Sequence, residues 1–348
     1  MNQIKIIFFI LIIVFLFCSC GTMFLSGGFK DGDWFYLENE GALMPVWVNG
    51  NIQSEIFIIY LHGGPGAGCV DAVVTSAFKE LQKNFAVVCY EQRGSGSSQG
   101  SAKNESKSIT QFTEDLEKII ALIKYKYNNP KLFLMSHSWG GTVGTSYLLK
   151  PENQQQISGW ISINSGYNLE DGALLSIEWA ENKANEQITS GININYWQKE
   201  LEWYSANPDA SEFSNVYRHF SNIDKLRGVY YDPSRSFIKP EIPFFNTPYS
   251  IFYFLNIVSL VSKGSLNLFN YNYFPQMYNI NIPSLILWGI HDGVLPVDLA
   301  YDAYNSLGSD DKTIFIFENS AHIPYIEEPL LFAEKIIEFI NRTSGQVR

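Results

Sequence analysis

Short apolar runs that recur along the chain constrain its fold more than any other feature. Residues 56–61 read Ile-Phe-Ile-Ile-Tyr-Leu, an unbroken apolar stretch that ends in a histidine and two glycines. A strand of this kind carries apolar side chains on both faces, so it belongs in a largely parallel sheet that helices cover on both sides. Further strands are predicted at residues 85–90, 132–135, 159–164, 284–289 and 313–317.

Helical patterns separate these strands. Phe112, Leu116, Ile119 and Ile123 recur at helical spacing within residues 108–127, and Ser108 with Gln111 fits a capping box. Other helices are predicted at residues 72–81, 139–149, 298–306 and 330–341, and two alternating runs at 34–37 and 43–48 predict an antiparallel hairpin.

From residue 167 to 278 the alternation of strand and helix stops, and amphipathic pieces rich in aromatic residues take its place. The pattern predicts an α/β protein with a doubly wound, mostly parallel sheet and a helical cap inserted after the sixth strand. The predicted domains are 20–166 with 279–348 for the α/β domain and 167–278 for the cap, after a signal at 1–19.

Composition excludes two broad classes. Hydrophobic residues make up 46% of the chain and charged residues 17%, which is the composition of a chain with a core and not of a disordered one. A net charge of −11 leaves no basic face for nucleic acid. Aromatic residues reach 15%, many of them in the cap, and this suggests a cap that selects an apolar group.

The N-terminus predicts export. Lys5 precedes an apolar run over residues 6–18, shorter than the about 20 residues of a membrane-spanning helix but suited to a secretory signal. Ser19-Cys20-Gly21 then resembles the lipidation site of a bacterial lipoprotein, with Phe17 where leucine is usual. We expect a lipoprotein anchored by Cys20 at the cell envelope. An uncleaved anchor, with no charge over residues 6–25, and simple secretion are the alternatives.

Cysteine and histidine spacings give no metal site. Cys69 and Cys89 do not suggest a disulfide framework, and Cys89, within an apolar strand, is expected to be a buried small apolar side chain. The five histidines form no metal-binding motif, so we expect neither a metal nor another cofactor. These are His62, His137, His219, His291 and His322.

Ser138 lies where a strand turns sharply into a helix. A nucleophile at such an elbow needs small residues two positions before and after it, and Ser136 and Gly140 stand there. Trp139 would donate a backbone N–H to a developing oxyanion at the start of the helix. A second donor is expected from the glycine-rich loop after residues 56–61, with Gly64 as first choice and Gly63 as second.

An acid and a base are expected later in the chain, in the order serine, aspartate, histidine. Asp292 follows the strand 284–289, and His322 follows the strand 313–317. His322 would accept the proton of Ser138, and Asp292 would orient and stabilise the imidazolium. The rival base His291 should point away from its neighbour Asp292. His62 should brace its own loop, His137 should pack against the sheet, and His219 should be a surface or cap residue.

Three motifs together resemble the proline iminopeptidase (prolyl aminopeptidase) branch of the α/β-hydrolases. They are HGGPG at residues 62–66, EQRGSGS at 91–97 and SWGG at 138–141. The similarity covers residues 32–348 apart from the cap. It implies an α/β-hydrolase fold, cleavage of an N-terminal residue, often proline, without metal, and triad roles for Ser138, Asp292 and His322. The loop of Arg93 is expected to be structural.

The chain departs from that family at two places. Ser136 replaces the first glycine of the elbow, and the cap has no match. The family holds the free amine of its substrate with cap glutamates near tryptophans, and Glu178, Trp179 and Glu181 are the nearest candidates here. A buried amine needs such a carboxylate partner. The same spacing also describes an ordinary solvated helix face.

The sequence is therefore compatible with three functions. The first is an exported serine aminopeptidase of the proline iminopeptidase type. The second is a carboxylesterase or lipase-like hydrolase of apolar acyl esters, suggested by the uncharged residues 249–261 and the lipid anchor. The third is a non-catalytic binding protein on a hydrolase scaffold, against which the intact triad argues. The expected partners are a small peptide or ester substrate and a membrane; the oligomeric state stays open.

Overall fold

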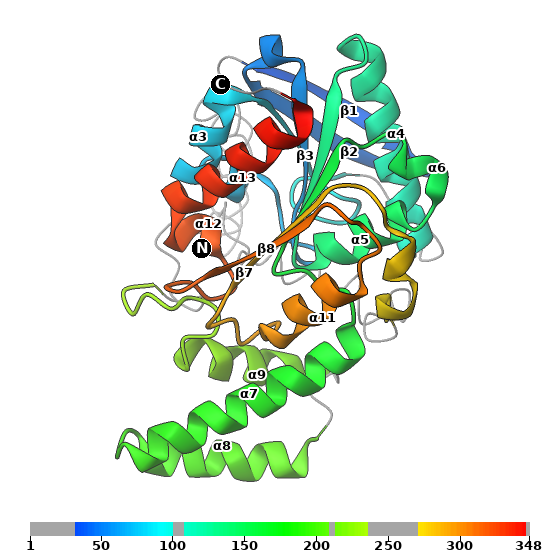
Figure 1. Cartoon of the computed structure of the whole chain (residues 1–348). Helices are drawn as coiled ribbons and strands as arrows, with labels where there is room; N and C mark the ends of the chain where they lie inside the picture. The colour runs from blue at the N-terminus through cyan, green and yellow to red at the C-terminus, as the bar shows by residue number, and fades with distance from the viewer. Residues whose placement is uncertain (1–31, 100–107, 209–212, 236–270, 346–348) are drawn as a thin grey trace, which may run out of the picture.

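A computed structural model describes residues 32–99, 108–208, 213–235 and 271–345 (Figure 1). The signal at 1–19, Cys20 and the apolar residues 249–261 lie outside the described residues. The eight strands of the sheet are β1 Asp33–Asn39, β2 Ala42–Gly50, β3 Ile56–Leu61, β4 Ala86–Tyr90, β5 Lys131–His137, β6 Gly159–Ile163, β7 Ser284–Gly289 and β8 Lys312–Phe317.

The strands form one sheet in the order β1-β2-β4-β3-β5-β6-β7-β8. β1 pairs antiparallel with β2 and β2 antiparallel with β4, and all later neighbours are parallel. The predicted hairpin is confirmed. Its turn consists of Glu40 and Gly41, both with positive φ (45° and 75°), which matches the twist of the strands that they join.

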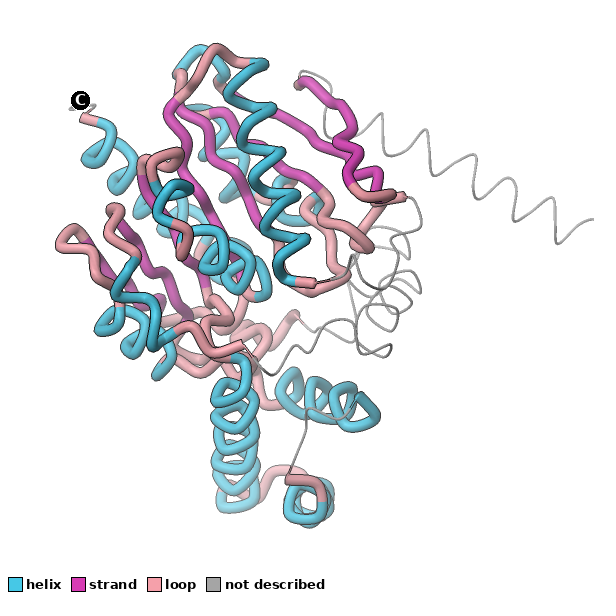
Figure 2. The backbone as a smooth tube through the Cα atoms, turned by 90° about the vertical axis from the view of Figure 1, so that its right-hand side faces the viewer, coloured by secondary structure: helices cyan, strands magenta, loops and turns pink. Residues whose placement is uncertain are grey.

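Helices cover both faces of the sheet, as the apolar strands require (Figures 1 and 2). One apolar core packs beneath α4 (Ile109–Lys126) and α5 (Trp139–Leu148) and extends to α11 (Asp298–Ser306). A second packs beneath α3 (Ser76–Asn84) and α13 (Pro329–Ser344). All side chains of β3 are buried between the two cores. The helices of this domain are α2 Val70–Val73, α3 Ser76–Asn84, α4 Ile109–Lys126, α5 Trp139–Leu148, α6 Pro151–Gln154, α11 Asp298–Ser306, α12 Pro324–Glu327 and α13 Pro329–Ser344, with 3-10 turns η1 Ile52–Ser54 and η4 Phe274–Asn279.

Two local predictions have different outcomes. Ser108 caps α4 as predicted, since its hydroxyl accepts the backbone N–H of Gln111 at 3.3 Å. The single helix predicted over residues 72–81 is wrong, because Thr75 adopts an extended conformation and ends the first turn. Its hydroxyl donates to the carbonyl of Ala72 at 2.7 Å, and a separate helix α3 starts behind it.

The cap follows the sixth strand. Helices α7 Leu169–Thr189, α8 Ile194–Ala206 and α9 Phe213–Lys225 lie between β6 and β7 in the chain and project from the rest of the molecule (Figures 1 and 2). α7, α8 and the residue that directly follows α9 form a small apolar core, which consists of Ile177, Ala180, Ala184, Trp197, Tyr204 and Leu226. The predicted fold class is thereby confirmed, while the exact domain boundaries stay predictions. Among the described helices, none is both long and apolar enough to cross a bilayer.

One expectation about cysteine is wrong. Cys69, just before α2, and Cys89 in β4 form a disulfide with their Cα atoms 5.9 Å apart. Both residues are fully buried, so Cys89 does lie in the core as a strand residue should. Its partner comes from the loop after the neighbouring parallel strand β3, a proximity that only the sheet order creates.

Candidate active site

Ser138 occupies the sharp turn between β5 and α5. Its backbone has φ 55° and ψ −122°, a conformation that residues other than glycine rarely adopt. Backbone hydrogen bonds hold it there: its N–H donates to Ile163 at 3.1 Å, and its carbonyl accepts from Gly141 at 2.8 Å and Gly166 at 3.0 Å. Strain that the surroundings enforce in this way is typical of a functional position.

The two small residues beside the elbow have different roles. A Cβ atom on Gly140 would lie 2.2 Å from the carbonyl oxygen of Leu61, so only glycine fits there. Ser136, in place of the usual first glycine, is fully buried, and its hydroxyl accepts the indole N–H of Trp160 at 2.9 Å. The substitution thus fits the turn, because the added polar group has a partner.

The structure brings Ser138, His322 and Asp292 together. His322 Nε2 lies 3.1 Å from Ser138 Oγ, and its Nδ1 lies 2.8 Å from Asp292 Oδ2. The three residues come from the ends of β5 and β8 and from the turn after β7. This is the arrangement in which an imidazole can take the proton of a serine hydroxyl while a carboxylate holds the other ring nitrogen.

Asp292 is fully buried and its carboxylate is surrounded by donors. Oδ1 accepts the backbone N–H groups of Val294 at 2.8 Å and Leu295 at 2.9 Å, and Oδ2 accepts Asn164 Nδ2 at 2.6 Å. These donors, which come from two parts of the chain, fix the orientation of the carboxylate. Sequence reasoning missed Asn164, although it directly follows β6 at the carboxyl edge of the sheet.

The backbone of His322 also forms two hydrogen bonds that fix its position. Its N–H donates to the carbonyl of Val229 at 3.2 Å, and its carbonyl accepts His137 Nε2–H at 2.9 Å. Burial, with the nearby His322 as a further cause, lowers the pKa of His137 to about 3. His137 is therefore a neutral support for the base, which is more specific than the packing role expected for it.

The glycine-rich loop after β3 lies against Ser138. A Cβ atom on Gly63 would be 3.1 Å from Ser138 Cβ, whereas one on Gly64 would instead meet the backbone of Gly66 at 2.7 Å. Gly63, the second choice as oxyanion donor, is thus the glycine that adjoins the serine, and Gly64 has the positive φ of 134° that turns the loop. Trp139, the other expected donor, begins α5 directly behind Ser138.

Gln92 forms hydrogen bonds both with the glycine-rich loop after β3 and with Trp139 at the start of α5. Its backbone N–H donates to His62 Nε2 at 3.1 Å and its amide donates to the carbonyl of His62 at 2.9 Å. Its amide oxygen accepts the indole N–H of Trp139 at 3.1 Å. His62 Nδ1 in turn donates to the carbonyl of Gly63 at 2.7 Å, and burial lowers the pKa of His62 to about 4. Gln92 therefore links Trp139 to His62, the residue that precedes Gly63 and Gly64 in the glycine-rich loop.

Arg93 has the structural role expected of its loop. It is fully buried and binds Asp115 with two nitrogens, each 2.6 Å from a carboxylate oxygen, while its Nη2 also donates to the carbonyl of Asn39 at 3.3 Å. A bidentate pair of this type has a defined geometry. It joins the EQRGSGS loop to α4 and β1.

The remaining histidines lie away from Ser138. His291 Nε2 donates to the carbonyl of Glu318 at 3.1 Å, and its ring stacks on Tyr231 with centroids 3.9 Å apart. This position agrees with the expectation that it is not the base. His219, expected to be either a surface residue or a cap residue, lies on α9 of the cap. It is buried, with hydrogen bonds to Ser176 on α7 and Tyr204 on α8.

The cap residues considered for amine binding are dispersed. Glu178 on α7 is exposed, and Glu181 is half-buried. Trp179 packs against the α/β domain, since a Cβ atom on Gly293 would lie 2.5 Å from its ring and one on Gly228 would lie 2.7 Å away. Of the three, Trp179 alone is placed at the edge of the triad, beside the turn that follows Asp292.

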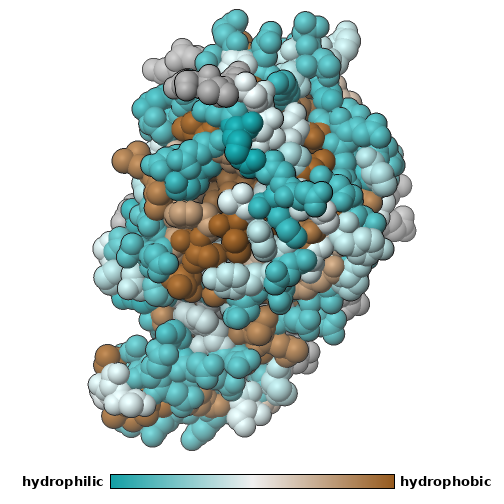
Figure 3. Space-filling model, in the orientation of Figure 1, coloured by the Kyte–Doolittle hydropathy of each residue, from teal (hydrophilic) through white to brown (hydrophobic). Residues whose placement is uncertain are grey.

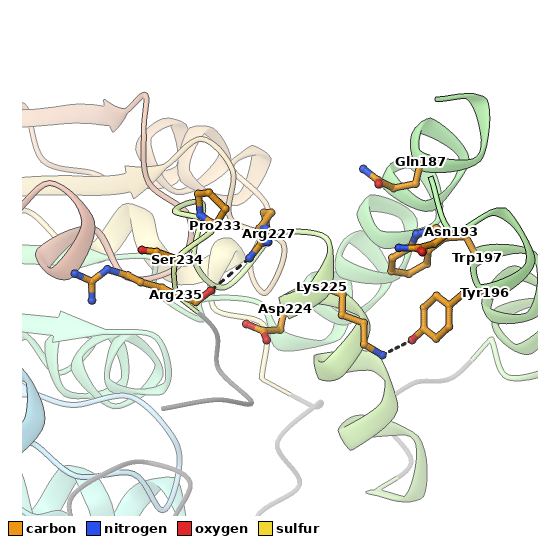
Figure 4. A pocket seen from close by; sticks show the side chains of 10 residues that line it. All are labelled: Gln187, Asn193, Tyr196, Trp197, Asp224, Lys225, Arg227, Pro233, Ser234 and Arg235. Carbon is orange, nitrogen blue, oxygen red and sulfur yellow. Dashed lines mark hydrogen bonds between the residues drawn. The ribbon is translucent and has the colours of Figure 1, made fainter. Parts of the chain in front are cut away.

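A cavity of about 670 Å³ lies in the cap, but it does not contain the triad (Figure 4). The charged groups that line it have partners within the chain: Lys225 donates to the hydroxyl of Tyr196, and Arg227 donates to the carbonyl of Arg235. The side chain of Arg235 points away from the cavity in Figure 4. Figure 3 shows that apolar side chains instead gather above the cap, near β7 and β8.

Comparison with known proteins agrees with this geometry. A family model described as alpha/beta hydrolase fold matches residues 57–329. A protein named "Probable aminopeptidase YbaC" from Bacillus subtilis (strain 168) is 26% identical over 298 residues, which are 84% of this chain and 91% of the relative. A proline iminopeptidase from Heyndrickxia coagulans is 26% identical over 290 residues, 82% of this chain and 90% of the relative.

Two solved structures share the fold. The proline iminopeptidase-related protein from Thermus thermophilus has a TM-score of 0.62 at 19% identity, covering 89% of this chain and 98% of that one. A bacterial membrane phospholipase A has a TM-score of 0.63 at 17% identity, covering 97% of this chain and 98% of that one. At these identities the likeness concerns the fold alone.

Proposed function

The chain belongs to the alpha/beta hydrolase fold family, and from that premise we propose that it is an exported serine hydrolase that works through an acyl-enzyme. The observation that carries the proposal is the continuous hydrogen-bonded arrangement of Ser138, His322 and Asp292 at a strained elbow. A serine that its surroundings hold at positive φ, in contact with a buried histidine–aspartate pair, is typical of a catalytic position and supports the proposal.

In the proposed reaction Ser138 Oγ attacks the carbonyl carbon of the substrate while His322 Nε2 takes its proton. Backbone N–H groups of Trp139 and of Gly63 or Gly64 stabilise the oxyanion, and Asp292 stabilises the imidazolium. His322 then returns the proton to the leaving group, which departs and leaves an acyl-enzyme. A water molecule, activated by the same histidine, hydrolyses the ester and restores Ser138.

Our preferred substrate is a peptide with a free N-terminus, and the activity is release of its first residue, as in proline iminopeptidases. One relative is named a probable aminopeptidase and another a proline iminopeptidase, and the similarity spans 91% and 90% of their lengths. The HGGPG and SWGG motifs of this chain resemble those of the proline iminopeptidase branch. A substrate amine needs a carboxylate close to the acyl site. Glu178 and Glu181 remain the candidates from the sequence.

An esterase acting on apolar acyl groups is the second candidate. It is favoured by one observation, the exposure of Glu178 and the partial exposure of Glu181. An acyl ester has no ammonium group and therefore needs neither carboxylate.

One pair of assays separates the two candidates. Purified protein is tested on a proline arylamide and on short-chain aryl esters, with Ser138→Ala as the control. Release from the arylamide supports the aminopeptidase, and ester turnover without arylamide release overturns it in favour of the esterase. Activity that survives in Ser138→Ala would reject the triad altogether.

Export to the cell envelope, with a lipid on Cys20, is part of the proposal. The buried disulfide between Cys69 and Cys89 supports it, because structural disulfides persist in oxidising compartments and are rare in the cytosol. The mass of the protein extracted from membranes tests it. A chain that still begins at Met1 without lipid contradicts cleavage before Cys20.

A further inference from the structure

A chain of buried hydrogen bonds crosses the cap and ends beside the triad. Tyr204 on α8 contacts His219 Nδ1 on α9 at 2.9 Å, and His219 Nε2 contacts Ser176 Oγ on α7 at 2.9 Å. Ser176 Oγ donates to the carbonyl of Gly293 at 2.5 Å. Gly293 directly follows Asp292. The hydrogen-bonded side chains of Tyr204, His219 and Ser176, here called the file, therefore connect three cap helices to the turn beside Asp292.

The direction of every bond in this file is determined. The carbonyl of Gly293 can only accept, so Ser176 uses its single hydroxyl hydrogen there. Ser176 Oγ must then accept from His219, which places the ring hydrogen on Nε2. Nδ1 accepts the hydroxyl hydrogen of Tyr204. A neutral His219 with this tautomer is the form that satisfies all three contacts, and burial lowers its pKa to about 4.

The inner end of the file meets the turn that holds the acid. The backbone N–H groups of Val294 and Leu295, in the same turn as Gly293, donate to Asp292 Oδ1. Trp179 from α7 packs directly on Gly293, and the N–H of Gly293 donates to the carbonyl of Gly228 at 2.9 Å. Ser176 is therefore bound to the same turn whose backbone N–H groups orient Asp292.

The outer end is anchored by a cap ion pair. Asn222 Nδ2 contacts the hydroxyl of Tyr204 at 3.4 Å and donates to Glu200 Oε2 at 2.7 Å. Arg218 binds the same carboxylate with two nitrogens at 2.8 and 2.9 Å. The file thus starts at a fixed ion pair and ends at a fixed turn, and each side chain between them is held by a hydrogen bond on both sides.

We infer that His219 is a positioning residue: through Ser176 and the carbonyl of Gly293 it fixes the turn that orients Asp292, so that the packing of the cap sets the geometry of the triad. This rests on the proposed hydrolase function, because it assigns His219 a part in the same reaction. His219 touches neither Ser138 nor His322, and it acts only through Asp292.

The test compares two replacements of one ring. His219→Phe keeps the aromatic volume and removes both hydrogen bonds, whereas His219→Gln supplies one donor and one acceptor. The number of active sites is titrated with a fluorophosphonate, and kcat and KM are measured per titrated site on the better of the two substrate classes. Ala184→Gly, which loosens α7 at a buried position outside the file, is the matched control.

We expect His219→Phe to lower kcat roughly ten- to a hundredfold with little change in KM, since a small displacement of a catalytic group has effects of this size. His219→Gln should recover most of the loss. Ser176→Ala should resemble His219→Phe, and the double variant should be no worse than either, because both remove one path. Ala184→Gly should keep the wild-type kcat per site.

Two results overturn the inference and differ from a failure of the proposed function. A wild-type kcat per site in His219→Phe shows that the file does not orient Asp292, and an equal loss in Ala184→Gly shows that cap stability alone matters. If the wild-type protein itself neither reacts with fluorophosphonate nor hydrolyses either substrate, it is the proposed function that fails, and the catalytic role of His219 fails with it.

Discussion

Asp292 receives hydrogen bonds from two separate parts of the chain, the turn that follows it and the end of β6. Both carboxylate oxygens of Asp292 therefore accept hydrogen bonds in addition to the contact of Oδ2 with His322. Among the described residues, Asn164 is the side chain besides His322 that contacts this carboxylate. Asn164 also donates to the carbonyl of Ala321 at 3.3 Å, next to His322, so it holds acid and base at a fixed separation.

Replacement of Asn164 by alanine should lower kcat by roughly ten- to a hundredfold. A hydrogen bond to a charged group contributes about 1.5–3 kcal/mol, and its loss frees the carboxylate to rotate. The measurement is kcat per titrated site. Asn153→Ala, which removes a buried asparagine bound to Glu117 far from the triad, should leave kcat unchanged. Equal losses in both variants would argue against a role for Asn164 at the site.

Glu91, the first residue of the EQRGSGS loop, should make the stability of the fold depend on pH. It is buried, its Oε2 has no described partner, and burial together with Asp71 raises its pKa to about 8 from an ordinary 4.5. Between these two values the folded chain keeps a proton that the unfolded chain releases. The contribution of Glu91 to stability is therefore full below about pH 4.5 and is lost as the pH rises towards 8.

Glu91→Gln should weaken this dependence of stability on pH. Its free energy of unfolding, measured by urea denaturation from about pH 5 to 8, should fall less with rising pH than that of the wild type. Glu338→Gln, on the exposed face of α13, provides the control and should follow the wild type. Parallel curves for wild type and Glu91→Gln would show that Glu91 titrates normally.

Among the elements of the fold, the loop after β3 is held at three points along its length. The disulfide joins its end to β4, Gln92 joins its start to Trp139, and Ser95 Oγ accepts the N–H of Gly66 at 3.1 Å. These contacts come from one neighbouring strand and the loop behind it. A loop that must present backbone N–H groups to an oxyanion benefits from this rigidity, since preorganised donors need no reordering during the reaction.

The double variant Cys69→Ser/Cys89→Ser should be less stable by about 3 kcal/mol, because the disulfide closes a loop of 20 residues in the unfolded chain. Thermal unfolding should show a lower Tm. Reductant should lower the Tm of the wild type towards that of the variant and leave the variant unaffected. An identical Tm for all four samples would mean that the bond does not form in the protein.

The elements themselves were predictable because their signals are local. Continuous apolar runs marked the inner strands, and helical spacing with a capping serine marked α4. The error at residues 72–81 arose because Thr75 bonds to its own backbone and interrupts a pattern that still looks helical. The triad residues were predicted for a related reason: in a parallel sheet the residues after the carboxyl ends of strands gather at one edge.

At the scale of the whole molecule, the catalytic domain and the cap have separate cores. Two large apolar clusters flank the sheet, whereas α7, α8 and Leu226 in the cap form a separate small one. The cap meets the α/β domain through Trp179 and Ser176 at Gly293, next to the acid of the site. A substrate that displaces the cap would therefore act on the same turn that orients Asp292.

Cys20→Ala should release the protein from the membrane if the proposed lipid anchor is correct. Lipidated wild type should partition with membranes and require detergent, and the variant should appear in the soluble part of the cell envelope or remain as an unprocessed precursor. Ser19→Thr, a small change before the cysteine, should keep the lipid. Membrane association that is unchanged in Cys20→Ala would favour an uncleaved apolar anchor.

The order of the strands, most of the helices, the cap after the sixth strand and the residues at the sheet edge could be predicted from the amino-acid sequence. They depend on side-chain periodicity and on where each strand ends, and both are local properties of a chain. The pairing of Cys69 with Cys89, the hydrogen bond from Asn164 to Asp292 and the place of His219 in the file that leads to Gly293 depend on how the elements pack. Each of these contacts joins residues from different elements, and distance along a chain does not reveal which elements pack together.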